Sequence, residues 1–571
     1  MTADALAPPA RRGWLSALAV YLERRTLVML ALGFAAGLPN LLIFDTLSLW
    51  LRESGLSLEV IGFFALATLT YALKFVWAPL VDRTAIPGLT RLFGHRRSWM
   101  LVAQAAVIFG LWSIAGLNPA QALAPVALFA VLVGFAGATQ DIVIDAWRIE
   151  ATDESRQGAM AAAYQWGYRI AIIVAGAVPL VLAEQFNWSL SYAVMAALMG
   201  IGVAAVLLAP RERAHVVRPI PVGDTPARPL ADRVEWLARL LLIALAALVI
   251  GTGLTGQPDL AGGVLRALGT PAAAVEGFSA AFTAKPGGVW LQFGAVLAGF
   301  ALLALACWPL PGRGTRPGAY LAGSFGQPLA DFFRRFGGAA AMILALICLY
   351  RLADFVLNIM NPFYADLGFS KTEIAEVRKV FGVAASMAGV FLGGLSVVRL
   401  GLIRTMVVGA FASPVSNLIF GWLAVQGPEV WALFVAIGVD NVATGYAGTA
   451  LIAYMSSLTS AGFTATQYAL FSSLYALPGK LVASQSGRIV EASARAAEAG
   501  GPLAAFKPLF AGLPPESFKA GAVTAGVTPA GLGAGYMVFF LYSAVIGVAA
   551  IALAFMVAAR SRGDGAAAAP G

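Results

Sequence analysis

The sequence has little charge and very little cysteine or histidine. Charged residues make up 12% of its 571 positions, whereas a soluble domain carries about 25%. Hydrophobic residues make up 60%, and the mean hydropathy is +0.80. This composition excludes a soluble globular protein and predicts an all-α polytopic membrane protein. The two cysteines, Cys307 and Cys348, lie in apolar runs, so we expect neither a disulfide framework nor a zinc site.

Histidine is too scarce to build a metal or haem centre. His95 and His215 both fall in expected loops, and we therefore expect no metal and no cofactor. The net charge of +9 can indicate a nucleic-acid partner, but basic loops of a membrane protein explain it better. The N-terminus lacks a short apolar segment with a small-residue cleavage site, so we expect no cleaved signal peptide.

Long apolar runs are abundant. A spanning helix needs about 20 apolar residues, and this length predicts about fourteen spans arranged six, two and six. The first six lie near 26–50, 57–82, 98–117, 121–147, 157–184 and 188–209. Two further spans lie near 236–256 and 287–309. The last six lie near 338–363, 370–398, 402–425, 429–456, 464–490 and 532–559.

These spans divide the chain into five segments. We expect a cytoplasmic N-terminal segment with an interfacial helix (1–25), an N-terminal six-helix bundle (26–210), basic linkers with two extra helices (211–337), a C-terminal six-helix bundle (338–560) and a disordered tail (561–571). Arg and Lys concentrate in alternate loops, which predicts that both termini are cytoplasmic.

A weak internal repeat supports two equivalent halves. Gly55-Leu56-Ser57 opens the second span, and Gly368-Phe369-Ser370 opens its counterpart in the second half. Arg169 and Lys480 occupy matching places in the fifth span of each half. Two six-helix halves related as parallel repeats are the major facilitator architecture.

The fourth span carries Gln140, Asp141 and Asp145. Asp141 and Asp145 are four residues apart and share one helix face. Carboxylates inside a membrane are costly and usually face a pathway or a partner, so both are candidates for proton coupling. The alternative is a permanent ion pair that holds the first half together, and for Asp145 that partner is Arg148.

Three cations lie within spans. Lys74 costs about 2.5–3.5 kcal/mol on insertion scales, so it needs a substrate carboxylate or a partner such as Asp141 or Asp145; snorkelling is the alternative. Arg169 can bind a carboxylate through two hydrogen bonds or form a structural salt bridge to the fourth helix. Lys480 has the same alternatives, and the preceding Pro478 and Gly479 predict a bent helix.

The second half has its own polar stripe. Arg351, Asp354 and Asn358 share one face of the seventh core helix. We expect Arg351 and Asp354 to form an intramembrane pair and Asn358 to contact substrate. Asp440, in the tenth core span, is a further proton-coupling candidate.

A cytoplasmic gate is predicted where the second span ends. An acidic helix end clasped by basic residues stabilises one access state, and the residues concerned are Asp82, Arg83, Arg96 and Arg97. Other polar and aromatic residues suit a sugar substrate, although helix–helix packing explains them equally well. These are Gln104, Gln140, Gln467 and Tyr164.

Several motifs together resemble a known family. They are Gly33-Phe34-Ala35-Ala36-Gly37-Leu38-Pro39, Lys74 to Arg83 followed by Gly94 to Trp99, Gln140 to Trp147, Gly167-Tyr168-Arg169, and Thr464 to Leu470. This set resembles the AmpG muropeptide permeases, a branch of the major facilitator superfamily that also includes acetyl-CoA transporters. The resemblance covers roughly 26–210 and 338–490. The departures are Asp45, Lys480 in place of an expected arginine, and an insertion at 86–93.

The resemblance implies a proton-coupled importer of anhydro-muropeptides in the bacterial inner membrane. Its substrate would be GlcNAc–anhydroMurNAc with or without peptide, recovered for peptidoglycan recycling, a process connected with β-lactam resistance. We expect a monomer in the lipid bilayer whose partners are substrate and protons. Lys74, Arg169 and Lys480 would meet carboxylates.

Three alternatives stay open at this point. An acetyl-CoA carrier would need arginines converging on phosphates. A membrane enzyme is disfavoured because the sequence offers no nucleophile–base pair and no metal cluster. A non-transporting sensor would not need to retain a polar interior.

Overall fold

The computed structural model describes residues 19–54, 69–153, 156–210, 225–284, 287–307, 315–356, 359–370, 373–374, 376–483 and 486–567. Most of the expected interfacial helix, the Gly55-Leu56-Ser57 element, His215 and Asn358 lie outside these residues, as do the side chains of Asp45 and Lys480. The described elements are helices without a strand among them, which confirms the all-α prediction.

The first half begins with two interrupted spans. Its elements are α2 (Arg24–Leu41), η3 (Leu42–Thr46), α3 (Leu47–Glu53), α5 (Leu69–Leu73), η5 (Lys74–Val76), α6 (Ala78–Arg83), α7 (Leu89–Phe93), α8 (His95–Ala115), α9 (Leu123–Glu150), α10 (Gln157–Gln185), α11 (Trp188–Leu198) and α12 (Gly200–Leu208). The second span tightens into one 3₁₀ turn at η5, and such a turn inside a helix often marks a functional segment.

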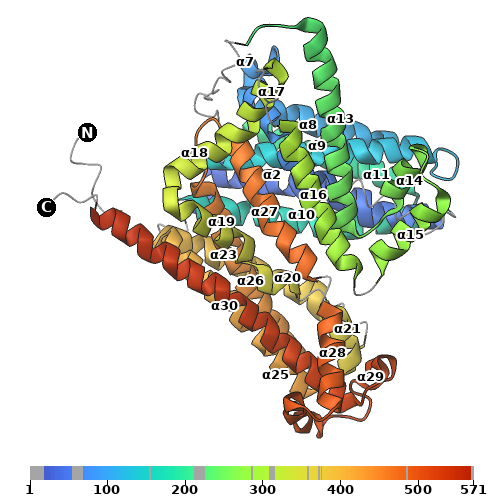
Figure 1. Cartoon of the computed structure of the whole chain (residues 1–571). Coiled ribbons are helices and arrows are strands. Elements are labelled where there is room, and N and C mark those ends of the chain that lie inside the picture. Colours follow the sequence, from blue (N-terminus) through green and yellow to red (C-terminus); the bar gives the residue numbers. More distant parts are fainter. Residues whose placement is uncertain are drawn as a thin grey trace.

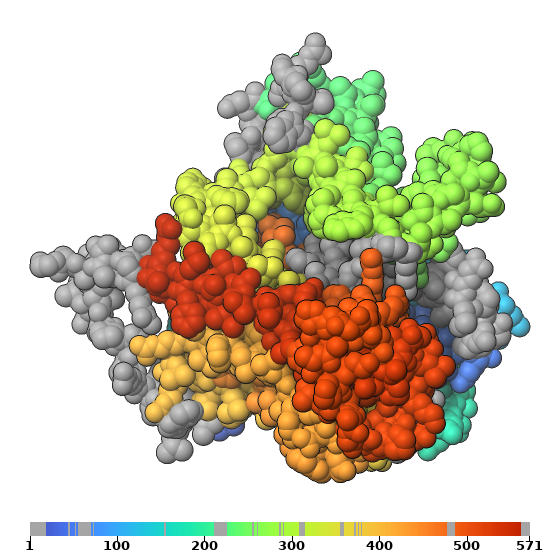
Figure 2. Space-filling model, turned by 60° about the horizontal axis from the view of Figure 1, so that its bottom comes forward, coloured from blue at the N-terminus to red at the C-terminus, as the bar shows by residue number. Residues whose placement is uncertain are grey.

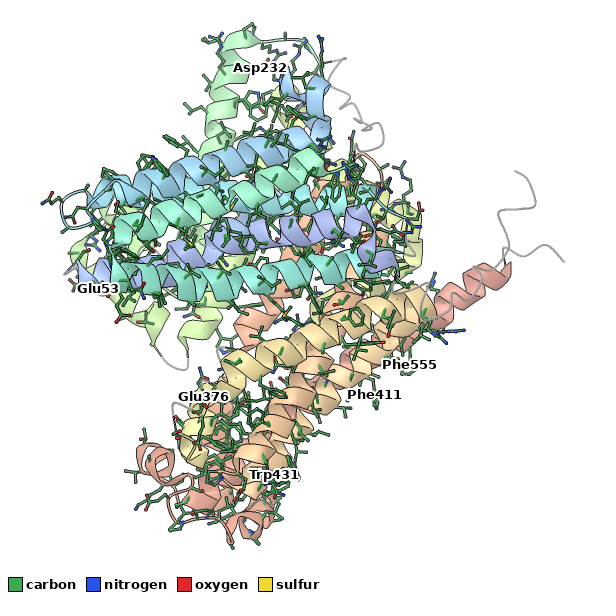
Figure 3. All side chains as sticks on the ribbon, turned by 180° about the vertical axis from the view of Figure 1, so that it is seen from behind. Glu53, Asp232, Glu376, Phe411, Trp431 and Phe555 are labelled. Carbon is green, nitrogen blue, oxygen red and sulfur yellow. The ribbon has the colours of Figure 1, made fainter. Side chains whose placement is uncertain are left out.

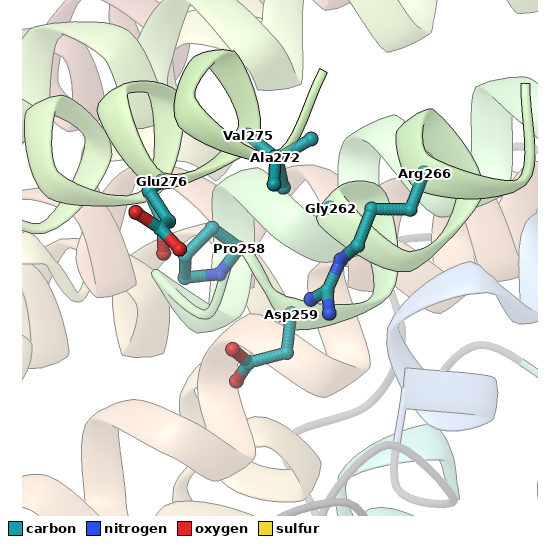
Figure 4. A pocket seen from close by; sticks show the side chains of 8 residues that line it. Pro258, Asp259, Gly262, Arg266, Ala272, Val275 and Glu276 are labelled. Atoms are coloured by element: carbon teal, nitrogen blue, oxygen red, sulfur yellow. The ribbon is translucent and has the colours of Figure 1, made fainter. Parts of the chain in front are cut away.

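An inserted pair of long helices follows. It consists of α13 (Pro229–Thr255) and α16 (Gly288–Cys307), joined by α14 (Asp259–Ala267) and α15 (Ala272–Thr283). The insert packs beside the first half, where Phe300 stacks on Phe75 with ring centroids 5.9 Å apart. A cavity of about 200 Å³ separates α14 from α15, with Asp259, Arg266 and Glu276 on its walls (Figure 4).

The chain after the insert forms the basic linker and the second half, whose predicted start at residue 338 falls on η8. Its elements are α17 (Arg316–Leu321), η7 (Ala322–Gly326), α18 (Gln327–Phe336), η8 (Gly337–Ala339), α19 (Ala340–Leu349), α20 (Leu352–Val356), α21 (Met360–Leu367), η10 (Glu376–Phe381), α23 (Gly382–Leu400), α24 (Leu402–Ser416), α25 (Leu418–Gln426), α26 (Val430–Ser457), α27 (Thr464–Ala483), α28 (Ser486–Glu498), η11 (Pro502–Phe510), α29 (Lys519–Ala525) and α30 (Pro529–Ala567).

The stretch 491–531, expected as a loop, contains helical segments. α28, η11 and α29 fold onto the end of the second half, because Val490, Ala494 and Phe510 are buried against the same cluster as Phe363 and Tyr536. This group of segments projects as an orange mass in the space-filling view (Figure 2).

Eleven helices in the described part of the chain are long and apolar enough to cross a membrane. The remaining predicted spans, near 26–50, 57–82 and 464–490, fall on η3, on η5 and on the join between α27 and α28. The structure is therefore compatible with fourteen spans, and it establishes a multi-pass membrane protein.

The two halves meet at one end of the molecule and diverge toward the other (Figure 1). α18 and the C-terminal end of α30 lie where the halves meet. We call this the basic end, because Arg335 belongs to α18 and Arg83 contacts η7 and α18. Seen from behind, Glu53 lies on one diverging limb, and Glu376 and Trp431 lie on the other (Figure 3). α27 belongs to the second half but also packs against α6 and α9 of the first.

Glycines allow unusually close helix contacts within the first half. A Cβ on Gly33 would lie 2.2 Å from the backbone oxygen of Tyr164, and one on Gly167 would lie 1.9 Å from that of Leu30. Small residues at helix interfaces permit such close packing in membranes. They bring α2 against α10 and so fix the position of Tyr164 and its neighbours.

Candidate functional site

A buried cluster of Lys74, Asp141 and Asp145 lies in the first half. The Nζ atom of Lys74 is 4.0 Å from Asp141 Oδ2 and 3.8 Å from Asp145 Oδ2. Each of the three residues is less than 10% exposed. Burial of an ionised group is strongly unfavourable without a partner, so the shared ion pair accounts for charge inside this bundle.

Local structure sets this geometry. Asp141 and Asp145 lie one helical turn apart on α9, and Lys74 begins the 3₁₀ turn η5. The indole nitrogen of Trp77 donates to Thr139 Oγ1 at 3.1 Å, which anchors the second span to the fourth. The lysine is thereby placed opposite both carboxylates.

Tyrosines surround the acidic pair. Tyr71, Tyr164 and Tyr168 all lie within electrostatic range of Asp141. We had selected Tyr164 from the sequence and missed the other two. The available signal was helical spacing, since Tyr71 precedes Lys74 by three residues and Tyr168 follows Tyr164 by four.

Several polar atoms beside this cluster have no hydrogen-bond partner among the described residues. They are Asp141 Oδ1, the hydroxyl of Tyr71 and both amide atoms of Gln140, and all are buried. Buried polar groups are normally paired with protein or water. This part of the first half therefore has unused hydrogen-bonding capacity next to a carboxylate.

Arg169 lies on α10 without an ion-pair partner in the described part of the chain. The expected salt bridge to the fourth helix is not among the described contacts. Its electrostatic neighbour is Arg351 of the second half. On the same helix, Gln165 donates to Thr449 Oγ1 of α26 at 2.7 Å, so α10 contributes directly to the contact between the halves.

Arg351 lies in the turn between α19 and α20, where the seventh core helix is interrupted. Its Nε donates to Asp354 Oδ2 at 2.7 Å. Asp354 also accepts from the hydroxyl of Ser413. Asp440 lies nearby on α26 and accepts from Ser416 Oγ at 3.4 Å. The second half therefore holds a polar group of its own inside the bundle.

At the basic end, Asp82 joins the two halves. It accepts from Arg96 Nη2 at 2.7 Å, and Arg96 also contacts Glu150 at 2.7 Å. Asp82 Oδ2 accepts from the backbone nitrogen and hydroxyl of Thr466, at 2.8 and 2.6 Å. A carboxylate is favourable at a helix N-terminus, so Asp82 caps α27 of the opposite half.

The other predicted gate residues make different contacts. Arg83 donates to the backbone oxygen of Gly323 at 3.1 Å and to Gln327 at 3.2 Å. Arg97 donates to the backbone oxygens of Val206 and Leu207, which keeps it within the first half.

Arg148 adds a second link between the halves at the basic end. Its Nη1 atom donates to Ser456 at 2.9 Å, and its guanidinium lies 5.1 Å from the ring centre of Tyr468. The same side chain reaches Asp145 at 3.4 Å. Asp145 is thus shared between Lys74 and the contact that closes the basic end.

Two predicted substrate contacts lie elsewhere. Gln467 donates to the oxygen of Pro328 at 2.9 Å and accepts from the backbone nitrogen of Ser460 at 2.8 Å. Its amide is therefore occupied at the basic end, because α27 begins there. Gln104 lies inside the first half against Gly202, and its amide has no hydrogen-bond partner among the described residues.

His95 differs from its expected place in a loop. It is the first residue of α8, it is buried, and its Nε2 atom lies 2.7 Å from the backbone oxygen of Val81. Gly94, with φ +95°, lets the chain turn into the helix at that point.

The fold and the sequence both resemble those of known transporters. The family model described as Major Facilitator Superfamily matches residues 29–261. A solved proton:xylose symporter, XylE bound to 6-bromo-6-deoxy-D-glucose, covers 92% of this chain and 95% of its own with a TM-score of 0.50 at 12% identity. The chain therefore has a major facilitator fold and resembles that superfamily.

Curated relatives support the resemblance to the AmpG branch. The chain is 28% identical to "Putative transporter AmpG 4" of Rickettsia conorii, over 82% of this chain and 91% of that protein. It is also 28% identical to "Anhydromuropeptide permease" of Escherichia coli K12, over 83% of this chain and 76% of that protein. The chain is therefore a multi-pass membrane protein that is similar, over most of its length, to proteins named as AmpG transporters and an anhydromuropeptide permease.

Proposed function

We propose that this transporter imports anhydro-muropeptides together with protons. The observation that carries the proposal is Lys74, shared at 4.0 and 3.8 Å between the buried carboxylates Asp141 and Asp145. When a carboxylate exchanges a cationic partner for a proton, its protonation can be coupled to the change between access states of the bundle. The name of one relative, an anhydromuropeptide permease, supports the substrate class, and the resemblance to the AmpG family implies GlcNAc–anhydroMurNAc with or without peptide.

The chemistry of that substrate suits the free groups of the first half. Arg169 forms no ion pair with a described residue. Its guanidinium can therefore donate two parallel hydrogen bonds to a substrate carboxylate. Gln140 and the tyrosines at 71, 164 and 168 offer hydroxyl and amide contacts of the kind that sugars use. Lys480 remains a proposed carboxylate contact on the basis of sequence, as does Asn358.

Orientation follows from charge. Arginines are concentrated at the basic end, so the positive-inside rule places that end, and both termini, in the cytoplasm. The bacterial inner membrane is then the site of action. With the basic end closed by Asp82 and Arg148, the diverging limbs face the outside, which is the state expected to receive an incoming solute.

Reconstituted protein tests the proposal. Proteoliposomes are given labelled GlcNAc–anhydroMurNAc under an inward proton gradient, and uptake is measured with and without uncoupler. We expect accumulation that uncoupler abolishes. Uptake that persists unchanged with uncoupler would refute proton coupling, and acetyl-CoA transport in place of sugar uptake would refute the substrate class.

A further inference from the structure

A polar cavity lies within the second half. It has a volume of about 270 Å³ and lies among α20, α21, η10, α25 and α26. Its walls combine two arginines, two aspartates and two neutral polar residues with apolar neighbours. The polar members are Arg351, Asp354, Arg378, Asp440, Asn441 and Thr444.

The charges on these walls are unequally satisfied. Arg351 is neutralised by Asp354 at 2.7 Å. Arg378 donates to the side chain of Asn361 but forms no ion pair with any described residue. Asp440 has only the hydroxyl of Ser416, at 3.4 Å, and likewise lacks a described ion pair. One cation and one carboxylate are therefore left free on the walls of a single cavity.

The two free groups lie at different depths. Arg378 is exposed and belongs to η10, a π-helical segment, and π-helical turns are frequent at functional sites. Glu376 of the same segment lies on the limb that diverges from the first half (Figure 3). Asp440 is half-buried on the regular helix α26. An anion arriving between the limbs would meet Arg378 first.

We propose that this cavity binds a carboxylate-bearing arm of the transported molecule at Arg378, and that Asp440 takes up a proton in addition to the one coupled through Asp141 and Asp145. The inference rests on the proposed function and deepens it. Ligand pockets for whole drug-sized molecules measure about 300–1,000 Å³. A cavity of about 270 Å³ therefore suits one acidic arm, while the rest of the sugar lies between the halves.

Electrostatics link the two events. Asp440 is faced by Asp354 of α20, Arg351 at the start of that helix, Arg378 of η10 and Tyr364 of α21. A substrate carboxylate bound at Arg378 would join Asp354 and Asp440 as the third negative charge beside two arginines. Protonation of Asp440 restores balance, because like charges in one site disfavour ionisation. Binding of anion and proton then favour each other, as thermodynamic linkage requires.

Full-length protein in proteoliposomes tests this with a matched pair of probes. Peptide-free GlcNAc–anhydroMurNAc carries a free lactyl carboxylate, and its methyl ester does not. We expect wild type to take up the acid with a KM about 10- to 100-fold lower than that of the ester, the range of one charge-assisted contact. Arg378→Gln should remove that preference by raising the KM for the acid toward that for the ester, and Arg378→Lys should restore part of it.

Controls separate this inference from the proposed function. Arg404→Gln, an exposed change at the basic end, should behave as wild type. Asp440→Asn should reduce the pH dependence of affinity for the acid between pH 5.5 and 8, whereas wild type weakens more steeply as pH rises. If wild type transports the acid, and Arg378→Gln both keeps the full preference for it over the ester and leaves uptake of a peptide-bearing muropeptide unchanged, the cavity assignment is wrong and the proposed function stands.

Two further experiments identify which carboxylate binds and test the cavity if no transport is seen. A peptide-bearing muropeptide has its lactyl carboxyl in an amide bond, so an effect of Arg378→Gln on that substrate alone assigns the arm to the peptide and still supports the site. If wild type takes up no disaccharide, the proposed function fails, and binding of N-acetylmuramate against its methyl ester is measured by tryptophan fluorescence. Equal binding of acid and ester would then refute the cavity assignment.

Discussion

At the scale of single residues, the account depends on how buried charges are compensated. Lys74 shares two carboxylates, and one oxygen of Asp141 has no described hydrogen-bond partner. Removing one member of a buried charge cluster is costly because the others are left uncompensated, typically by about 3–5 kcal/mol. The cluster can thus be stable as a whole and still respond to one proton.

Asp141→Asn tests the proton site. The amide keeps the size of the side chain but cannot exchange a proton, so we expect gradient-driven uptake to fall at least 100-fold while the protein still folds. Lys74→Ala should give a comparable loss. Asp232→Asn, in the first turn of α13 in the insert, is the matched control. Normal uptake by both cluster variants, with folding checked by gel filtration and thermal melting, would show that the site lies elsewhere.

Arg169 gives a second prediction at this scale. Loss of a charge-assisted hydrogen bond to substrate costs about 1.5–3 kcal/mol, which corresponds to a KM increase of about 10- to 100-fold for Arg169→Gln. Arg169→Lys keeps the charge and loses the paired geometry, so we expect an intermediate KM. Initial uptake rates over a substrate series measure both. An unchanged KM for Arg169→Gln would assign this guanidinium a purely structural role.

At the scale of helices, interruptions coincide with the charged residues. Lys74 lies on a 3₁₀ turn, Arg351 between α19 and α20, and Arg378 on a π-helical segment. Interrupted helices expose backbone groups that must face a cavity or a partner. Regular helices such as α9 and α10 carry the opposing acids, tyrosines and Arg169. Lys74, on an interrupted segment, therefore faces acids on a regular helix.

The capping of α27 by Asp82 gives a prediction about access. Asp82→Asn leaves the helix N-terminus without its charge and leaves Arg96 with Glu150 alone, so the basic end should open more often. A cysteine at Ala469, in a background lacking Cys307 and Cys348, should then react with a thiol reagent about 10-fold faster. Arg97→Gln is the control, because Arg97 donates to backbone oxygens of α12 within the first half. Equal labelling rates would contradict a gate at Asp82.

Helix packing gives a prediction about stability. Gly167→Ala places a methyl group 1.9 Å from the backbone oxygen of Leu30, and such overpacking costs about 1–3 kcal/mol. Gly200→Ala meets nothing within 4 Å and should be neutral or slightly stabilising, because alanine favours helix. Thermal melting in detergent compares them. Equal midpoints for both variants and wild type would mean that the α2–α10 contact relaxes easily.

At the scale of the whole molecule, the sequence predicts the fold well because span length and charge pattern are local properties. It also predicts Lys74 with Asp141 and Asp145, since a buried lysine needs an acid. It does not predict that Asp82 caps α27, that Gln467 is occupied by Pro328, or that 491–531 is helical. These outcomes depend on tertiary contacts between segments distant in the chain, which spacing alone does not encode.

The proposed transport cycle moves protons and sugar through the two halves in one coupled step. The most direct test records external pH in a weakly buffered suspension of proteoliposomes when GlcNAc–anhydroMurNAc is added without an imposed gradient. We predict alkalinisation of the medium as protons enter with the sugar, and none with Asp141→Asn. Sugar entry by the wild-type protein without any change in external pH would contradict the central claim.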